Sequence, residues 1–483
     1  MYNLNRHTRG TRAGPESERK GAKKGMKDFS GYMKQGRRGH LIGVGGVSMS
    51  PLAEVLTGMG LVIRGSDMRD GENVARLRDR GIEVRIGHRA ENITSDLDFV
   101  VRTAAVHDDN PEVAAAHSLG IPVFERTEAW GAIMRDYPRS VCISGTHGKT
   151  TTTSMLTHIL MAAELDPTVM IGGTLPLLHA GHRVGKGDTI VLEACEYCNS
   201  FLNFYPTIAV ILDIEADHLD FFKDLEDIQR SFRQFASQVP PDGTLVVNLE
   251  DKATMEAVAG LDRKLLTFGL TDRADVYAEN IRSLGTQTEF DILYRGELFV
   301  RAAIHVPGIH NVKNALAACA AAICLGCNPL AVKYGLAGFT GAGRRFEFKG
   351  KYNGADVYDD YAHHPGELAA LLDAVSGLGY KRIVTVFQPH TYSRTKALFA
   401  DFVEQLRRPD MTILAEIYAA RETNTVGISS RDIAAEIPNS LYFDSFEEIL
   451  KTLRLAAAPG DLILTVGAGD IYKVGEALVA GEK

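Results

Sequence analysis

The stretch CISGTHGKTTTTSML, from Cys142 to Leu156, decides how the chain is interpreted. An apolar run typical of a buried strand leads into a glycine-rich turn, and a pattern typical of a helix follows. The common phosphate-loop spelling, G-x-x-x-x-G-K-[ST], requires a glycine where this chain has Ile143. The nearest upstream glycine is Gly145, so the lead-in is shortened. The strand–turn–helix setting still predicts a loop that binds the phosphates of a nucleotide.

The residue types in this loop suit a polyphosphate and a cation. A helix N-terminus offers unpaired N–H groups and the positive end of a dipole, and glycines let the backbone approach an anion closely. Lys149 supplies a point charge, and the Thr150 hydroxyl suits Mg²⁺. Threonines that satisfy backbone donors at a helix start are the purely structural alternative. The residues expected to bind the nucleotide are Gly145, Thr146, His147, Gly148, Lys149, Thr150 and Thr151.

The composition is that of an ordinary globular protein without a membrane span. Of 483 residues, 45% are hydrophobic and 24% charged, and no uninterrupted apolar run reaches the ~20 residues of a membrane helix. The formal net charge of −8 argues against a protein that coats nucleic acid. Six cysteines without the spacing of a secreted framework favour a reducing cytoplasm. The length predicts roughly three domains, and the oligomeric state is not defined by the sequence.

The beginning of the chain differs in charge from the rest. Residues 1–40 hold eleven Lys/Arg and three Asp/Glu, and they lack the apolar segment of a secretory signal. We expect residues 1–39 to form a disordered basic arm. The alternatives are an artefact of start-site choice, since Met26 and Met33 precede the first strand, and a contact with membrane or RNA.

Strand and helix patterns alternate through the remaining sequence, which predicts an α/β fold of three domains, each a largely parallel sheet with helices on both faces. The first domain opens with a strand, the glycines Gly43, Gly45 and Gly46, a helix, and a strand that ends at Asp67, which is a βαβ unit. The expected domains are 40–137 (Rossmann-like), 138–343 (phosphate-loop domain) and 344–483 (Rossmann-like).

Acidic and imidazole side chains follow later strands of the phosphate-loop domain. Glu193 and Glu196 end one strand in VLEACEYCNSF, and His218 follows another in ILDIEADHLDFF. Functional groups collect at the carboxyl ends of parallel strands, so these residues are expected to meet a magnesium ion held by the loop. The pair Cys195 and Cys198 invites a redox or zinc interpretation, but no second pair stands at zinc-finger spacing.

Three further segments carry candidate residues. Asn311 and Asn314 stand three apart at a helix start, where their amides can reach an adenine edge. Arg344 and Arg345 lie near the boundary to the last domain, where a cation can reach a γ-phosphate. Two strands of the last domain bring a set of polar side chains to one rim, namely Asp359, Asp360, His363, His364, His390 and Arg394.

In order, the motifs form a specific set that runs from about His40 to the last helix: G-x-G-G, GTHGKTTTT, E-x-x-E, EADHLD, G-x-H-N-x-x-N-A-L-A-A, GRRFE, DDY-x-H-H-P and QPH-x-Y-x-R. This set resembles the Mur ligase family, the ATP-dependent ligases that build peptidoglycan precursors. The loop of that family reads GTxGKT, so a missing upstream glycine is normal there. The resemblance implies a UDP-sugar domain, an ATP domain and a C-terminal domain that helps bind an amino acid.

The reaction implied by the resemblance uses ATP and Mg²⁺ to activate the lactyl carboxylate of UDP-N-acetylmuramate as an acyl phosphate. The amine of L-alanine then displaces phosphate and forms an amide. Catalytic roles fall on Lys149, His218 and Arg345. The implied metal ligands are Thr150, Glu193 and His218; ATP contacts add Asn311, Asn314 and Arg344 to the loop; substrate contacts are Gly45, Gly46, Ser66, Asp67, Glu196, His363, His390 and Arg394.

Some positions depart from the family pattern, and other functions stay open. Cys195 and Cys198 stand where aspartates are common, and Thr391 replaces an arginine, so the amino acid is less defined than the reaction type. The nearest alternative is the murein-recycling ligase that attaches a tripeptide; folate polyglutamylation and cyanophycin synthesis are more distant. The glycine turn with Asp67 also permits an NAD-dependent dehydrogenase. A non-catalytic ATP-binding module is the last alternative.

Overall fold

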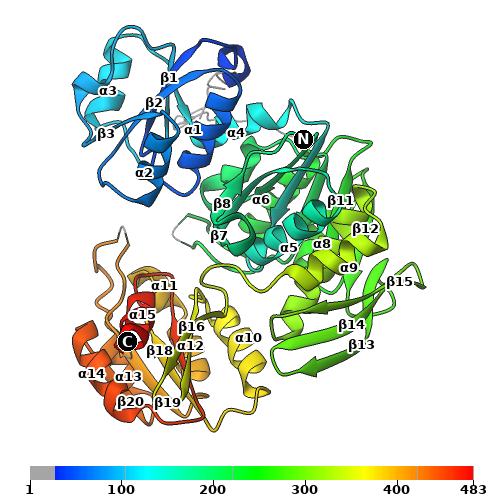
Figure 1. The fold of residues 1–483 in the computed structure, drawn as a ribbon, viewed down its shortest axis with the longest axis vertical. Coiled ribbons are helices and arrows are strands. Elements are labelled where there is room, and N and C mark those ends of the chain that lie inside the picture. The colour runs from blue at the N-terminus through cyan, green and yellow to red at the C-terminus, as the bar shows by residue number, and fades with distance from the viewer. Residues whose placement is uncertain (1–27, 104, 220, 421, 482–483) are drawn as a thin grey trace, which may run out of the picture.

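The computed structural model describes residues 28–103, 105–219, 221–420 and 422–481. They form three bodies that follow one another along the chain, each built on its own sheet (Figure 1). The predicted α/β fold with three largely parallel sheets is confirmed. Within the described part of the chain, no helix is both long and apolar enough to cross a membrane.

Part of the arm predicted for residues 1–39 is folded. A short 3-10 helix, η1 (Phe29–Tyr32), buries the ring of Phe29 among other aromatic rings of the first body. Strand β1 (Arg38–Ile42) begins shortly after it. The expectation of a disordered arm is therefore wrong for residues 28–39, because an aromatic side chain anchors them. Residues 1–27 lie outside the described residues.

The first sheet has the strand order β3-β2-β1-β4-β5, and all four pairings are parallel. The glycine turn after β1 and the carboxyl end of β2 therefore share one edge, as in other doubly wound sheets. The remaining elements are α1 (Met49–Gly58), β2 (Val62–Asp67), α2 (Glu72–Asp79), β3 (Glu83–Ile86), η2 (Ala90–Asn92), β4 (Phe99–Arg102), α3 (Pro111–Ser118), β5 (Val123–Glu125) and α4 (Arg126–Met134).

The central sheet has ten strands in the order β15-β14-β13-β12-β11-β10-β6-β9-β7-β8. Its middle is parallel, while β13, β14 and β15 form antiparallel hairpins at one edge and β7 and β8 pair antiparallel at the other. Its strands are β6 (Arg139–Ser144), β7 (Thr168–Leu175), β8 (Ala180–Arg183), β9 (Thr189–Glu193), β10 (Ile208–Ile211), β11 (Thr244–Asn248), β12 (Lys264–Gly269), β13 (Val276–Leu284), β14 (Gln287–Tyr294) and β15 (Glu297–Ile304). Its helices are α5 (Lys149–Ala162), η3 (Pro176–Leu178), η4 (Tyr197–Asn203), α6 (Leu225–Ser237), α7 (Lys252–Val258), α8 (Ile309–Cys324) and α9 (Pro329–Gly338).

The last sheet has the order β16-β17-β21-β18-β19-β20, and only the β16–β17 pairing is antiparallel. Its strands are β16 (Glu347–Tyr352), β17 (Ala355–Asp360), β18 (Arg382–Phe387), β19 (Met411–Ala415), β20 (Ser440–Phe443) and β21 (Asp461–Val466). Its helices are α10 (Pro365–Ser376), α11 (Tyr392–Ala397), α12 (Phe399–Leu406), α13 (Ser430–Ala435), α14 (Phe446–Ala456) and α15 (Tyr472–Ala480). We keep 40–137, 138–343 and 344–483 as proposed domain ranges, and the strands of the three sheets are consistent with them.

The buried strands of the central sheet explain why helices cover both of its faces. Along β6, Cys142 packs with the core on the side of α6, whereas the next residue, Ile143, packs with the core on the side of α5 and α8. Side chains of a strand alternate between the two faces, and both faces of these strands are apolar. The phosphate loop therefore leaves the middle of a sheet that is fixed from both sides.

Candidate active site

The phosphate loop joins β6 to α5 through two glycines that no other residue could replace without strain. Gly145 has a φ of +142° and Gly148 a φ of +79°. A Cβ on Gly148 would lie 2.4 Å from Asn314 Oδ1, and one on Gly145 would lie 2.8 Å from the Cβ of Leu212. The turn is therefore tight and closely packed despite its shortened lead-in.

The segment after β10 holds the loop in place through Asp213. The backbone N–H of His147 donates to Asp213 Oδ1 at 2.8 Å, and that of Thr146 donates to the Asp213 carbonyl at 3.1 Å. Burial raises the pKa of Asp213 to about 6, although the charge of His147 opposes the rise. Asp213 was not among the predicted site residues, because its only signal in the sequence is its position just past a strand end.

Lys149 lies in the mouth of the loop. Its Nζ donates to the carbonyls of Gly145 and Thr146, at 2.5 and 3.1 Å, and lies 3.1 Å from Glu196 Oε2. Burial lowers the pKa of Lys149, but the neighbouring carboxylates, Glu196 foremost, outweigh burial and raise it above its usual value. The ammonium group is thus kept charged where the phosphates of a nucleotide would lie.

Thr150 and Glu193 meet as the sequence analysis expected. The Thr150 hydroxyl donates to Glu193 Oε1 at 3.0 Å, and the backbone N–H of Gly172 donates to Glu193 Oε2 at 2.7 Å. The carboxylate is therefore oriented from β7 as well as from the loop. A hydroxyl and a carboxylate in contact are oxygen donors of the kind that Mg²⁺ prefers.

Glu196, which is predicted to contact the substrate, lies beside the phosphate loop. It is 3% exposed, and its carboxylate lies between Lys149 Nζ and His218 Nε2, the latter at 3.5 Å. Burial lowers the pKa of His218, which favours the neutral imidazole. Glu196 and His218 thus form a second group of possible cation ligands next to Lys149.

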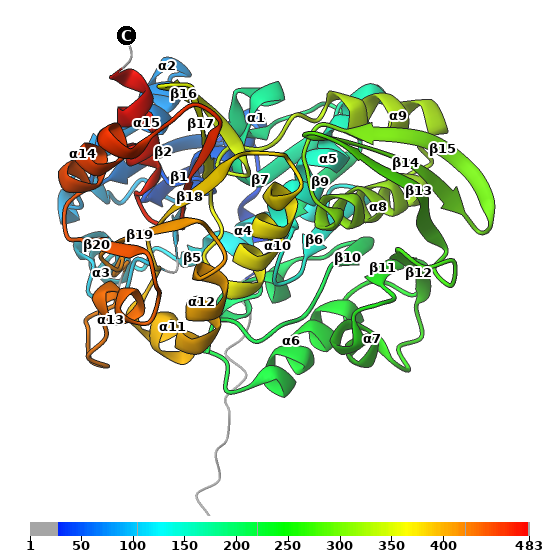
Figure 2. The same ribbon diagram turned by 90° about the horizontal axis from the view of Figure 1, so that it is seen from below.

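A cavity of about 270 Å³ opens between the phosphate loop, α8 of the central domain and α10 of the last domain, whose facing arrangement Figure 2 shows. The side chains of Asn311 and Asn314 line it, with Asn314 Nδ2 donating to Asn311 Oδ1 at 3.3 Å. Burial lowers the pKa of His310, another lining residue, to about 4. His310 and Lys313, which were not among the predicted site residues, also line the cavity from α8.

The two adjacent arginines of GRRFE, Arg344 and Arg345, point to different parts of the structure. Arg345 lines the cavity, with its guanidinium 3.9 Å from Glu367. Arg344 does not line it: its side chain donates to Asp359 at 2.9 Å and to two backbone carbonyls of the loop after β21. The prediction that Arg344 binds the nucleotide is therefore wrong in this conformation, because its donors are occupied within the last domain.

A second cavity, of about 210 Å³, lies where the loop after β10 meets the loop before α11. The guanidinium of Arg394 donates to Asp217 Oδ1 at 2.8 Å from Nη2 and 3.2 Å from Nε. Although burial opposes it, Arg394 and His218 hold the pKa of Asp217 well below its usual range. His390 lines the same cavity. The predicted rim residues Arg394 and His390 are therefore brought together with His218 from another domain.

His363 lies beside this group. Its ring centroid is 5.9 Å from that of His390, and its Nδ1 is 3.0 Å from the carbonyl oxygen of Tyr361. Burial lowers the pKa of His363 to about 4, although Glu367 acts against burial. Glu367, which the sequence analysis missed, also accepts the backbone N–H of His363 at 3.0 Å. Its signal was the capping pattern H-P-G-E at the start of a helix.

The residues of the first domain that are predicted to contact substrate lie at one edge of its sheet, but the side chain of one of them, Ser66, is buried. The backbone N–H of Gly45 donates to Asp67 Oδ2 at 2.9 Å, so the carboxylate fixes the glycine turn, and Gly46 is exposed beside it. Ser66, however, is fully buried, and its hydroxyl donates to Glu112 at 2.6 Å. The prediction of a substrate contact by the Ser66 side chain is therefore wrong in this conformation, because that side chain points into the core.

The sequence matches three family descriptions in succession: "Mur ligase family, catalytic domain" at residues 38–138, "Mur ligase middle domain" at 143–322 and "Mur ligase, glutamate ligase domain" at 344–469. Among curated relatives, the UDP-N-acetylmuramate–L-alanine ligase of Agathobacter rectalis is 48% identical over 91% of this chain and 97% of its own length. The enzyme of that name from Acetivibrio thermocellus is 46% identical over 90% and 94%.

Solved structures agree with these matches. The crystal structure of UDP-N-acetylmuramate–alanine ligase from Thermotoga maritima superposes with a TM-score of 0.78 at 28% identity, covering 92% of this chain and 99% of that one. A murein peptide ligase from Psychrobacter arcticus has the same fold, with a TM-score of 0.69 at 22% identity over 92% of this chain and 98% of that one.

Proposed function

The chain belongs to the Mur ligase family, and on that premise we propose that it joins L-alanine to the lactyl carboxylate of UDP-N-acetylmuramate at the expense of ATP. The observation that carries this function is the near-complete alignment, at 48% and 46% identity, with ligases of that name. The reaction is a step in the synthesis of peptidoglycan precursors for the cell wall. Because the reaction consumes ATP and the described cysteines are free thiols, we place the enzyme in the cytoplasm.

ATP fits the space between the phosphate loop and the first cavity. The loop supplies backbone N–H groups and the charge of Lys149 for the phosphates. The adenine ring fits the cavity beyond it, where the amides of Asn311 and Asn314 and the neutral ring of His310 are available for hydrogen bonds. Arg345 lies on the opposite wall, where its charge would face the γ-phosphate.

The two groups of acidic ligands fit Mg²⁺. Thr150 and Glu193 would hold one ion next to the phosphates, and Glu196 with His218 would hold a second on the substrate side. Bound magnesium neutralises the negative charge of the phosphates and of the attacking carboxylate. This assignment moves Glu196 from the substrate contacts to the metal ligands.

The chemistry requires two anions to approach each other. The lactyl carboxylate oxygen attacks the γ-phosphorus and ADP leaves, which gives an acyl phosphate. The amine of L-alanine then attacks the acyl carbon, inorganic phosphate leaves, and the nitrogen loses a proton. Positive charge from Lys149 and Arg345 stabilises the first transition state. Contact between the last two domains would keep water from the acyl phosphate.

The second cavity is the proposed site for L-alanine. It lies next to His218, and therefore next to the proposed second metal position. The guanidinium of Arg394 offers two parallel N–H groups, which bind a carboxylate well. In this structure both groups donate to the carboxylate of Asp217. The amino acid would bring its own carboxylate to Arg394 and its ammonium group to Asp217.

Phosphate release tests the function directly. Purified protein is supplied with ATP, Mg²⁺ and UDP-N-acetylmuramate, and the acceptor is varied between L-alanine, glycine, L-serine and a murein tripeptide. We expect release with L-alanine. Release with the tripeptide alone would favour the recycling ligase, and nucleotide binding without release under any acceptor would favour a non-catalytic module.

Replacing Lys149 tests the loop assignment. Lys149→Ala should lower kcat by about 10³-fold or more, because the removed charge faces the transferred phosphoryl group. The matched control is Lys333→Ala, on the exposed face of α9, which should retain activity. Lys333→Ala should keep the melting temperature of the unaltered protein within about 2 °C. Lys149→Ala should lower the melting temperature, because the buried Glu196 loses its ion-pair partner, so the activities are compared at a temperature at which both variants are folded. An active Lys149→Ala enzyme would contradict the loop assignment.

A further inference from the structure

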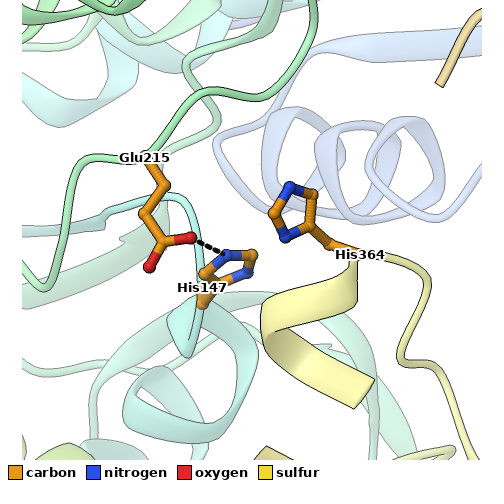
Figure 3. Close-up of side chains that lie close together, drawn as sticks. All are labelled: His147, Glu215 and His364. Carbon is orange, nitrogen blue, oxygen red and sulfur yellow. Dashed lines mark hydrogen bonds and ion pairs between the residues drawn. The ribbon is translucent and has the colours of Figure 1, made fainter. Parts of the chain in front are cut away.

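A group of side chains outside the proposed magnesium ligands lies where the phosphate loop meets the last domain. His147 comes from the loop itself, Glu215 from the segment after β10, and His364 from the residue that precedes α10 (Figure 3). We propose that these three residues bind one transition-metal ion of the zinc class, which bridges the central and C-terminal domains. This site goes beyond the ligase reaction, whose proposed cation ligands are other residues.

The three ligand atoms surround a space that a glycine leaves open. A Cβ placed on Gly366 would lie 3.4 Å from Glu215 Oε2, 3.5 Å from His364 Nδ1 and 3.8 Å from His147 Nε2. The ligand atoms of this group all lie within 4.8 Å of one another, and His147 Nε2 and Glu215 Oε2 are already 3.3 Å apart. They therefore converge from two domains on one point beside the first turn of α10.

The donor set selects the class of metal. Two imidazole nitrogens together with one carboxylate oxygen suit Zn²⁺ and similar ions, whereas Mg²⁺ prefers a shell made mostly of oxygen ligands. Zinc bonds of about 2.0–2.1 Å in a tetrahedron place ligand atoms roughly 3.3–3.5 Å apart. The pair His147–Glu215 has this separation, and the His364 ligand atom, which lies within 4.8 Å of the other two, would need to move by about 1.5 Å or less. Water would complete the fourth position, because the Glu215 side chain is 48% exposed.

The surroundings orient both imidazoles for this role. His147 Nδ1 lies 3.3 Å from Glu367 Oε1, which is the carboxylate–histidine arrangement that commonly supports metal ligands. His364 Nδ1 accepts the backbone N–H of Gly366 at 3.3 Å, so this nitrogen carries a lone pair rather than a proton and lies beside the first turn of α10. His364 is 8% exposed, and its Nε2 has no hydrogen-bond partner among the described residues. A metal on Nδ1 would replace a weak hydrogen bond.

The local charge also favours a cation. Burial lowers the pKa of His147, but hydrogen bonds to Glu215 and Glu367 outweigh burial and raise it well above its usual range. Those carboxylates hold a proton where a metal ion could take its place. Asp213 adds another acidic group to the same loop, and Arg345, near Glu367, is the nearby countercharge. Occupancy would fix the C-terminal domain against the phosphate loop and slow turnover.

Metal titration of the full-length protein without nucleotide tests the site. Zn²⁺ binding is followed by calorimetry, and Co²⁺ binding by the visible absorption of the four-coordinate ion. Three variants remove the site in different ways. His364→Asn retains a good helix cap but loses the imidazole; Glu215→Gln removes the charge; Gly366→Ala fills the gap with a methyl group at ordinary contact distances. The control is His117→Asn, on the exposed surface of α3.

Each site variant should lower the affinity for one equivalent of Zn²⁺ by about tenfold or more, whereas the control variant should leave this affinity unchanged. Gly366→Ala is the most specific of the three tests, because alanine is favourable in a helix and should not lower the melting temperature. The group Cys195, Glu196 and His218 could also take Co²⁺, but it would add a thiolate-to-cobalt band in the near ultraviolet. Equal Zn²⁺ affinity in all four variants and the unaltered protein, or cobalt bound only with the thiolate band, would overturn the proposal.

Discussion

The two junctions between the three domains are built on opposite principles. Between the first and central domains one apolar core continues without a break: Trp130 of α4 and Phe201 of η4 belong to the same buried cluster. Gly131 brings α4 so close to η4 that a Cβ there would lie 1.9 Å from the carbonyl oxygen of Asn203. Apolar area of this kind resists separation, so the first two domains should behave as one body.

The junction between the central and C-terminal domains is polar and hollow. The cores of the last domain are confined to its own sheet, and both cavities open along its contact with the central domain. The contacts across it are charged, namely Arg394 with Asp217 and His147 with Glu367. Domains joined by a polar interface are expected to move relative to each other, and the proposed ATP and alanine sites both lie at this junction. The proposed chemistry therefore lies at the polar junction and not at the apolar one.

Of the substitutions at the two junctions, one that breaks the polar junction should lower kcat/KM the most. Arg394→Ala leaves Asp217 as a buried charge without its partner, at a cost of about 3–5 kcal/mol. Because the cores of the last domain do not cross this junction, we expect the loss in kcat/KM, by about 10²- to 10³-fold, rather than in melting temperature. This loss in kcat/KM is measured by steady-state kinetics with L-alanine as the varied substrate. Arg301→Ala, whose side chain is 79% exposed on β15, is the control, and an equal loss there would refute the assignment.

A change of pH should act on the stability of the polar junction mainly through protonation of Asp360. This carboxyl lies in the wall of the first cavity, and burial raises its pKa from 3.8 to about 6, although Arg345 opposes the rise. The folded state then holds the proton more tightly than the unfolded chain. Its contribution to stability therefore falls as the pH rises from about 4 to about 6, by up to about 3 kcal/mol.

Asp360→Asn should remove that part of the pH dependence. The melting temperature of both proteins is measured between pH 4.5 and 7, and the slopes are compared rather than the absolute values. The side chain accepts the backbone N–H groups of Phe346 and Ala362, so the amide can shift stability at every pH. Parallel slopes for the two proteins would show that Asp360 does not titrate in this range.

The same contrast explains what the sequence could predict. The phosphate loop, the strand-end residues Glu193 and His218, and the alternation of strands and helices were readable because each follows from local pattern. Arg344 and Arg345 were not separable, since adjacent residues differ only in the direction their side chains take. A left-handed φ of +59° at Arg344 accompanies its turn into the last domain.

Contacts that join distant segments were hidden for a different reason. Ser66 sits on a strand whose pairing decides that its hydroxyl faces Glu112, and no local pattern reports this pairing. Glu367 could be identified as a helix cap, but not as a partner of His147 from another domain. Charged residues at a polar junction carry no periodic signal, whereas the apolar residues of the first junction do.

The smallest expected effect is at the apolar junction, and it should leave catalysis almost unchanged. Gly131→Ala forces a methyl group against the Asn203 carbonyl, so α4 must shift, at a cost of about 1–3 kcal/mol. We expect the first melting transition to fall by a few degrees while kcat stays within about threefold. Gly58→Ala, at the end of α1 with nothing near its Cβ, is the matched control and should not destabilise. Loss of kcat in Gly131→Ala without a change in melting temperature would show instead that the first junction also moves during the reaction.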